Sequence, residues 1–489
     1  MTFPDAVVTL PDADRGAVQV VPRPGSGWQT VALGAAWLVC ATVLQLVRAP
    51  GTPSWDTLWQ EDGGIFLTDA LHHHLLDALT RPYNGYLHMV PRLLAGAAVH
   101  LPLRDAAWFF AVSSALVVSA VSLYVFWASR LLVPAVWARG LIVVLVVLAP
   151  VSAYETGTNI NNLHWYLVFA CAWVPWSAPR GRAQVALSLA VVAAATLSDS
   201  EVVLLAPLFL PLAWQGLRQR RRVPLLVTAV LGACLLVQFL AGAQGQQPGR
   251  YDLSRWADVP GIFGLRVASS LLVGDRYLVR SYVALGSAYW VAALVLLGVL
   301  LVGAAALAPA ARPALAVTTV YGVVFLVVPV MLRGTAHFLT RPGTTLNGSR
   351  YALLPVLFLA SGLLTAAARL GPRLVQPDGR VAVLPSLLSL LTVTVVVANF
   401  ADVNVRGPGP SWRLELDRAA AVCARTGDAP RERATSADNP YGTLTVPTDV
   451  VVPVAPSLPH VVPFAVVLDC RQLRKEVPAA GLSVPLPAR

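Results

Sequence analysis

The chain has 489 residues, of which 56% are hydrophobic and only 12% are charged. With a mean hydropathy of +0.65, this composition excludes an ordinary soluble domain and predicts an all-α polytopic membrane protein. The formal net charge of +11 would also suit a nucleic-acid binder. The arginines, however, are scattered at the ends of apolar runs, as is typical of charges that set membrane topology. We therefore expect membrane lipid, and no nucleic acid, around this chain.

Apolar runs long enough to cross a bilayer predict the number of membrane spans. A helix needs ~20 apolar residues for one crossing. Residues 1–28 contain Pro and Asp and do not look like a signal peptide, so we expect a cytoplasmic N-terminal segment followed by an uncleaved first span. The run at 86–103, interrupted by His88 and Arg92, is expected to be an interfacial helix. About eleven spans remain between residues 29 and 400: 29–48, 106–128, 137–153, 163–178, 183–198, 201–215, 223–243, 284–308, 314–332, 351–369 and 381–400.

Short arginine-rich loops indicate the orientation of these spans. A cytoplasmic N-terminus puts three such loops inside, as the positive-inside rule requires: PRGR (179–182), GLRQRRR (216–222) and RLGPRLVQPDGR (369–380). This holds only if residues 183–214 form two short spans that meet at an outer turn with Asp199 and Glu201, and not one long helix. The long loops 49–105, 244–283 and 333–350 then lie outside, together with a domain at 401–489. The bias towards Arg, Ala, Val and Gly indicates a bacterial plasma membrane.

The stretch QEDGG (60–64) places two carboxylates, Glu61 and Asp62, soon after the first span. One interpretation is that they cap the helix that follows, because carboxylates favour a helix N-terminus. The other is a general base at the boundary of water and lipid, which takes a proton from an acceptor hydroxyl while its neighbour tunes its pKa or binds a cation. Both interpretations stay open at this point.

After QEDGG, the segment to residue 80 has the apolar spacing of a helix that lies along the membrane surface. Asp69, His73 and Asp77 recur at every fourth position, so we expect them on one face of that helix. They are weak candidates for metal ligands, because a solvated polar face is the better explanation for them. No cofactor is established by the sequence, although a divalent cation stays open.

Two further groups of polar residues are expected at headgroup depth. His88 and Arg92 lie one helical turn apart, where they could hold a lipid phosphate. Alternatively, Arg92 is a snorkelling side chain. In NINNLHWYL (159–167), Asn159, Asn162, His164 and Trp165 offer amides and rings that suit a sugar. The alternative is that Asn162 caps a helix and Trp165 belongs to the aromatic belt of the interface.

The layout of an acidic pair in a long first outer loop, interfacial helices, about ten further spans and an outer C-terminal domain resembles the GT-C class of integral membrane glycosyltransferases. The resemblance implies transfer of a sugar from a polyprenyl-phosphate donor to a hydroxyl or amide of a cell-envelope glycan, lipid or protein. It also implies that Glu61 or Asp62 is the base. An inverting displacement of this kind needs a cation beside the departing phosphate. Candidates are Arg341 and Arg350, the latter entering a span at Tyr351, although such arginines often only snorkel.

The hydropathy falls after Ala401, where residues 411–425 read as a helix and two Val-rich runs read as strands. We expect a small extracytoplasmic α/β domain at 401–489. About ninety residues bury a modest core, so a Cys423–Cys470 disulfide would help to fix the helix to a strand.

The main alternative function is a multi-pass transporter or flippase for a lipid-linked or small polar substrate. It would use Asp199 and Glu201 between short half-spans that meet at the membrane midplane. The two functions therefore place the important carboxylates at different depths.

Overall fold

The computed structural model describes most of the chain in eight ranges: 27–153, 155–243, 253–333, 348–375, 382–401, 406–426, 449–455 and 464–477. These residues are mostly helical, and each predicted span contains a helix. The helices in these spans are α1 (Gly27–Val47), α5 (Ala106–Ala128), α6 (Val136–Leu148), α7 (Leu163–Ser177), α8 (Arg182–Ser198), α9 (Ala206–Gln219), α10 (Arg222–Ala243), α14 (Ser287–Leu307), α15 (Arg312–Arg333), α16 (Arg350–Leu370) and α17 (Val383–Ala398).

Seven helices of the described chain are long and apolar enough to cross a membrane. They contain α1, α5, α9, α10, α14, α15 and α16. The other four, α6, α7, α8 and α17, have 13, 15, 17 and 16 residues, fewer than the ~20 that one crossing needs. The count of eleven crossings therefore stays a prediction. Helix α16 is buried from residue 351 to residue 368 and packs against α6, α7, α14, α15 and α17, so it forms the centre of one half of the bundle.

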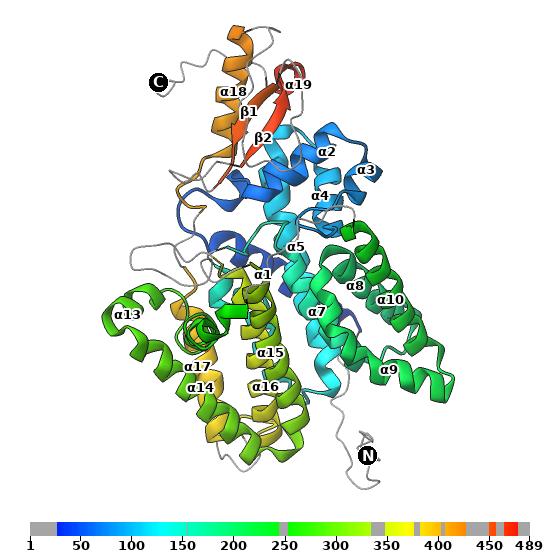
Figure 1. Ribbon diagram of the computed structural model, residues 1–489, viewed down its shortest axis with the longest axis vertical. Helices are drawn as coiled ribbons and strands as arrows, with labels where there is room; N and C mark the ends of the chain where they lie inside the picture. The colour runs from blue at the N-terminus through cyan, green and yellow to red at the C-terminus, as the bar shows by residue number, and fades with distance from the viewer. Residues whose placement is uncertain are drawn as a thin grey trace.

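Hydrogen bonds tie the helix ends together at the two ends of the bundle. At one end, Arg48, which follows α1, donates to Ser152 beyond α6 and to the carbonyl of Asn399 beyond α17. At the other end, Trp137 at the start of α6 donates to the carbonyl of Gly371 beyond α16. We call the first end the C-domain end, because the C-terminal domain sits there (Figure 1).

The polar break between residues 198 and 201 separates two helices, as predicted. Helix α8 ends at Ser198, and Asp199 has an extended backbone. The Asp199 carboxylate accepts a hydrogen bond of 2.8 Å from the amide of Glu201 and thereby starts the 3-10 helix Ser200–Leu205 that leads into α9. A single helix through this segment is excluded, because the extended residue interrupts its hydrogen-bond ladder.

The segment after QEDGG is not the single surface helix that its periodicity predicts. It is divided into a π-helix (Asp62–Leu67), α2 (Thr68–His72) and α3 (Leu75–Thr80). His73 and His74 have extended backbones, so Asp69, His73 and Asp77 do not share one helical face. The expected interfacial helix is also shorter than predicted: α4 spans Met89–Ala98 and follows a tight turn at Asn84 and Gly85, both with positive φ.

The expected loop at 244–283 is mostly helical where it is described, with a turn at 273–277. It contains a 3-10 helix (Leu253–Asp258), α11 (Val259–Phe263), a π-helix (Gly264–Ala268) and α12 (Ser269–Leu272), and α13 (Leu278–Leu285) begins within it. Short 3-10 turns at Ser54–Asp56, Leu103–Asp105, Ser129–Leu131, Pro150–Ser152 and Pro309–Ala311 complete the helical part.

The C-terminal domain has the small α/β form that its sequence pattern predicts. It contains α18 (Trp412–Thr426), β1 (Asp449–Pro453), β2 (Ala465–Asp469) and α19 (Cys470–Glu476). The strands pair antiparallel, with Val451 opposite Val467. Cys423 in α18 and Cys470 at the start of α19 form a disulfide with Cα atoms 5.5 Å apart. The disulfide therefore joins the helix to the end of the hairpin.

Candidate functional site

Asp62 is anchored to a loop that lies almost a hundred residues away in the sequence. Its side chain is 1% exposed, and its two carboxylate oxygens accept hydrogen bonds from the backbone amides of Ile160 and Asn161, at 3.0 and 2.8 Å. Burial raises the pKa of Asp62 to about 7, while Arg406 and these two amides act in the opposite direction. Since both oxygens are engaged, Asp62 is well placed to hold the 155–162 loop and poorly placed to take a proton from a substrate.

Glu61 has the opposite character. It is 9% exposed, its Oε2 is buried and makes no hydrogen bond with the described residues, and it makes no helix-capping hydrogen bond. Burial raises the pKa of Glu61 and the Glu155 charge adds to the increase, while the Arg350 charge, the Glu61 backbone amide and the Trp59 side chain oppose it. A raised pKa makes a carboxylate a stronger base near neutral pH. The capping interpretation therefore does not describe Glu61, and the two acids have different hydrogen-bond environments.

Arg350 and Glu155 form an ion pair at the start of α16. Glu155 is 4% exposed, and its Oε2 also accepts hydrogen bonds from the Ser349 hydroxyl and the Arg350 backbone amide, both at 3.3 Å. The Arg350 guanidinium lies 4.9 Å from the ring centre of Tyr351, so the two predicted residues do lie together. Because a helix N-terminus favours anions, Glu155 occupies the position where a phosphate would be most stabilised.

The amides of the 155–162 loop are mostly used within the loop itself. Asn159 and Asn162, predicted to bind substrate, both donate to the carbonyl of Glu155, at 2.7 and 3.3 Å. Asn162 also accepts from the Trp165 indole at 3.3 Å and does not cap α7 with its side chain. Asn161, the second amide of NINN, has a buried Oδ1 without a hydrogen bond to any described residue. It is therefore the amide of this loop that retains an acceptor for a ligand.

A row of aromatic rings connects the first loop to α7 and α16. Tyr86 and His88 stack with ring centres 4.2 Å apart, and the rings of His88 and His164 are 6.0 Å apart. His164 lies 4.4 Å from Trp165, which in turn lies 5.6 Å from Tyr351. The predicted ligand residues His88, His164, Trp165 and Tyr351 thus meet at one place. All four are buried, so Trp165 does not belong to an exposed aromatic belt.

Asp199 orients His164. Its Oδ2 lies 2.6 Å from Nδ1 of His164, and both side chains are buried. A carboxylate on one ring nitrogen fixes the orientation and tautomer of the imidazole. Asp199 therefore belongs to the same end of the bundle as Glu61, which does not favour the midplane carboxylate site that a transporter would need.

Arg92 is buried and paired, so it does not snorkel. It is 2% exposed, and its guanidinium donates to Asp69 at 2.8 Å and lies 5.4 Å from the ring centre of Phe66. Asp69 also lies 3.8 Å from Arg81, which contacts His73. No group of three or more His, Cys, Asp or Glu side chains in the described residues could hold a metal ion. The spacing that suggested Asp69, His73 and Asp77 as ligands is lost at the break between α2 and α3.

Arg341 lies outside the described residues. A different arginine, Arg406, lies close enough to Asp62 for its charge to act on that carboxylate. It is 3% exposed and donates to the carbonyls of Ser54, Thr57 and Thr158, at 3.1, 2.6 and 2.8 Å. Sequence reasoning missed it, because an arginine in RGPGP reads as part of a surface turn.

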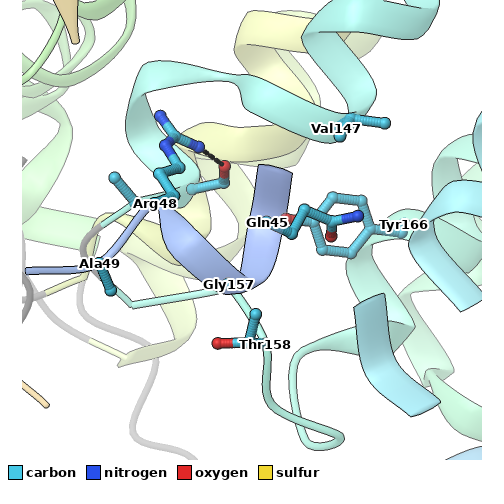
Figure 2. Close-up of a pocket in the computed structure, with 9 residues that line it drawn as sticks. Gln45, Arg48, Ala49, Val147, Gly157, Thr158 and Tyr166 are labelled. Carbon is cyan, nitrogen blue, oxygen red and sulfur yellow. Dashed lines mark hydrogen bonds between the residues drawn. The ribbon is translucent and has the colours of Figure 1, made fainter. Parts of the chain in front are cut away.

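The hollows around this site are small. Figure 2 shows one behind the 155–162 loop, lined by Gln45, Arg48, Gly157, Thr158 and Tyr166 among others, with Arg48 hydrogen-bonded to Ser152. Its volume is about 10 Å³, which is room for about one water molecule. A second hollow, of about 30 Å³, is mostly apolar and lies among α12, α14, α16 and α17. Neither is lined by Glu61 or Asp62, and a small-molecule site usually has at least ~300 Å³.

The glycines of QEDGG let the C-terminal hairpin approach the acids closely. A Cβ atom on Gly63 would lie 2.7 Å from Val454 Cγ1 and 3.0 Å from Val466 Cγ2. A Cβ on Gly64 would lie 3.0 Å from the Phe464 ring. The motif therefore combines two acids that face the bundle with two positions that only glycine fills without displacing the hairpin.

No protein-family model matches this sequence, and no curated protein sequence matches it. Among solved structures, the chain is similar to the oligosaccharyltransferase of Archaeoglobus fulgidus, crystallised with a tethered acceptor peptide that contains the NVT sequon. The superposition covers 82% of this chain at 13% sequence identity, with a TM-score of 0.42. The chain spans 58% of the length of that enzyme.

Proposed function

We propose that the protein is a membrane glycosyltransferase that moves a sugar from a polyprenyl-phosphate donor to a hydroxyl of a cell-envelope glycan or lipid, with inversion and with Glu61 as the general base. The observation that carries this proposal is the state of Glu61. It is a buried carboxylate with an oxygen that bonds to no described residue, close enough to Arg350 and Glu155 for both charges to act on its pKa.

The division of labour between the two acids supports a base at residue 61. Both carboxylate oxygens of Asp62 accept hydrogen bonds from the 155–162 loop, so in this proposal Asp62 acts as a positioning residue. Glu61, the neighbour that this anchoring holds in place, keeps an oxygen for the acceptor proton. In the transfer, the acceptor oxygen attacks the anomeric carbon, its proton goes to Glu61, and the bond to the phosphate oxygen breaks on the opposite face of the sugar.

Arg350 supports the departure of the phosphate. Its guanidinium and the N-terminus of α16 supply the positive charge that a leaving phosphate needs. Glu155 holds this position in the structure described here, so the donor phosphate has to replace it. The aromatic row from Tyr86 to Tyr351 and the Oδ1 of Asn161 lie in the same end of the bundle and suit the apolar faces and the hydroxyls of a sugar.

The hollow behind the 155–162 loop is too small for a sugar donor. In this proposal, loops at the C-domain end move apart to admit the donor to Glu61, as substrate-induced opening and closure commonly allow. We propose that this end faces away from the cytoplasm, because the arginine-rich loops 179–182, 216–222 and 369–380 belong to the opposite end of the predicted spans.

The proposal is tested with purified protein in lipid nanodiscs, radiolabelled polyprenyl-phosphate sugars and a panel of hydroxyl acceptors. Loss of a general base costs about 10²–10⁴-fold, so Glu61→Gln is expected to lower kcat by at least about a hundredfold. Asp105→Asn is the control, because Asp105 is a half-exposed acid beside the C-terminal domain. If Glu61→Gln and the control transfer sugar at the same rate, Glu61 is not the base.

A further inference from the structure

We propose that Arg406 is a positioning residue for the sugar transfer: its guanidinium clamps the segment before Glu61 to the loop that Asp62 holds, and so couples the C-terminal domain to the carboxylates. This inference rests on the proposed function. It concerns a residue that belongs to neither the bundle nor the QEDGG motif.

The Arg406 side chain alone joins acceptors in two separate segments of the chain. Arg406 donates to the carbonyl of Ser54 and to both the carbonyl and the hydroxyl of Thr57, on the approach to Glu61. It also donates to the carbonyl and hydroxyl of Thr158, at 2.8 and 3.1 Å, and more distantly to the carbonyl of Gly157. The planar fork of arginine can address several acceptors at fixed angles, which a lysine ammonium cannot reproduce.

Asp62 joins the same two segments through a separate pair of hydrogen bonds. It follows Thr57 by five residues and accepts from the amides of Ile160 and Asn161, which follow Thr158 closely. The Arg406 charge also stabilises the Asp62 carboxylate against the effect of burial, and Glu61 is the other charged group that acts on Asp62. Arg406 and Asp62 therefore form two neighbouring attachments of one loop to one segment, and Glu61, next to Asp62 in the chain, is close enough to Arg350 and Glu155 for their charges to act on it.

Other residues of the C-terminal region also contact the segment that leads to Glu61. Gly407 accepts from the Thr52 amide at 2.8 Å, and Ser411 donates to Asp56 at 2.6 Å. Ala455 donates from its amide to the Leu58 carbonyl at 2.8 Å, directly before QEDGG. The hairpin then packs on Gly63 and Gly64. The C-terminal region therefore contacts residues 52–64 at several successive positions. Arg406 is the residue of this region that also contacts the 155–162 loop.

Through the clamp, the C-terminal domain bears on catalysis by holding the segment that carries Glu61 in place. A base held within about half an ångström of its productive position needs rigid neighbours, and small displacements cost large factors in rate. We expect Arg406→Gln to lower kcat by at least about tenfold, because it releases several charge-assisted hydrogen bonds. The KM for the donor is expected to change by less than about threefold, because Arg406 does not touch the phosphate site.

The experiment compares Arg406→Gln, Arg406→Lys and the matched control Arg413→Gln in the full-length protein. Arg413 lies in the same region, with a side chain that is 55% exposed and 3.8 Å from Asp105. Two readouts are combined: donor kinetics per folded molecule, and hydrogen exchange of the peptide that covers residues 156–162. Arg406→Gln is expected to accelerate exchange at Ile160 and Asn161 by about tenfold, Arg406→Lys to give an intermediate change in both readouts, and Arg413→Gln to change neither.

The two readouts separate the two claims. If wild-type protein transfers no sugar from any donor, the proposed function fails, while the exchange measurement still tests the clamp. If Arg406→Gln exchanges like wild type in residues 156–162, the clamp is refuted. It is also refuted if exchange rises but kcat per folded molecule stays at the wild-type value, because Arg406 would then stabilise the fold without positioning the site.

Discussion

The contact between the C-terminal hairpin and Gly63 allows a prediction with a definite sign. In Gly63→Ala, the new methyl group would stand 2.7 Å from Val454 Cγ1 and 3.0 Å from Val466 Cγ2, where ordinary contacts begin at 3.4 Å. Both valines are at most 1% exposed, so neither can turn away into solvent. The variant therefore has to displace the hairpin or strain the π-helix.

Two opposing terms set the magnitude. Overpacking a filled site costs about 1–3 kcal/mol, whereas replacing glycine by alanine inside a helix gains up to about 1 kcal/mol. We expect a net loss of about 1 kcal/mol, which is roughly fivefold in the equilibrium for hairpin docking. Gly140→Ala in α6 is the matched control, because nothing lies within 4 Å of its Cβ position. In Gly140→Ala, only the gain from replacing glycine by alanine in a helix applies, because the new methyl group meets no neighbour.

The assay is thermal unfolding in one detergent, combined with hydrogen exchange of peptides from β1 and β2. Gly63→Ala is expected to lower the midpoint and accelerate exchange in the hairpin, and Gly140→Ala to leave the hairpin unchanged and raise the midpoint slightly. The reasoning is refuted if Gly63→Ala raises the midpoint as much as Gly140→Ala does and leaves exchange in β1 and β2 unchanged.

Two further predictions concern the acids. Because burial raises the pKa of Asp62 from 3.8 to about 7, the folded state binds this proton more tightly than the unfolded state does, and the free energy of unfolding should fall as pH rises from about 4 to about 7. Asp62→Asn should flatten this slope in denaturant titrations; an unchanged slope would assign it to other groups. In Glu155→Gln, Glu61 loses a charge that raises its pKa, so the acidic limb of the kcat/KM profile, which reports the free enzyme, should move to lower pH, and a move to higher pH would contradict the arrangement of charges.

The helices could be predicted because each depends on a local run of residues. Apolar runs, and the polar break at residues 198–201, are visible in the sequence, and a helix is present in every predicted span. The break at His73 and His74 was not visible. Their neighbours keep helical periodicity, but Arg81 contacts His73 and Arg92 holds Asp69. Periodicity reports which residues could share a face and carries no information on tertiary contacts that bend the backbone.

The site could be predicted only as a set of separate residues. The hydrogen bonds that build the site join residues far apart in the sequence. Asp62 and Asn161 are separated by 99 positions, Glu155 and Arg350 by 195, and Thr57 and Arg406 by 349. Such pairings are set by how the helix ends assemble, and no local pattern encodes them. The same reason explains why Glu61 and Asp62, adjacent and both acidic, could not be assigned different roles before their partners were known.

The most direct test of Glu61 as the base uses a nucleophile that carries no proton. Azide can attack the anomeric carbon of the same donor without deprotonation, whereas a hydroxyl acceptor needs a base. Glu61→Gln should lose transfer to the hydroxyl acceptor by at least about a hundredfold and keep transfer to azide near the wild-type rate. Equal losses with both nucleophiles, or undiminished transfer to the hydroxyl acceptor, would contradict proton removal by Glu61.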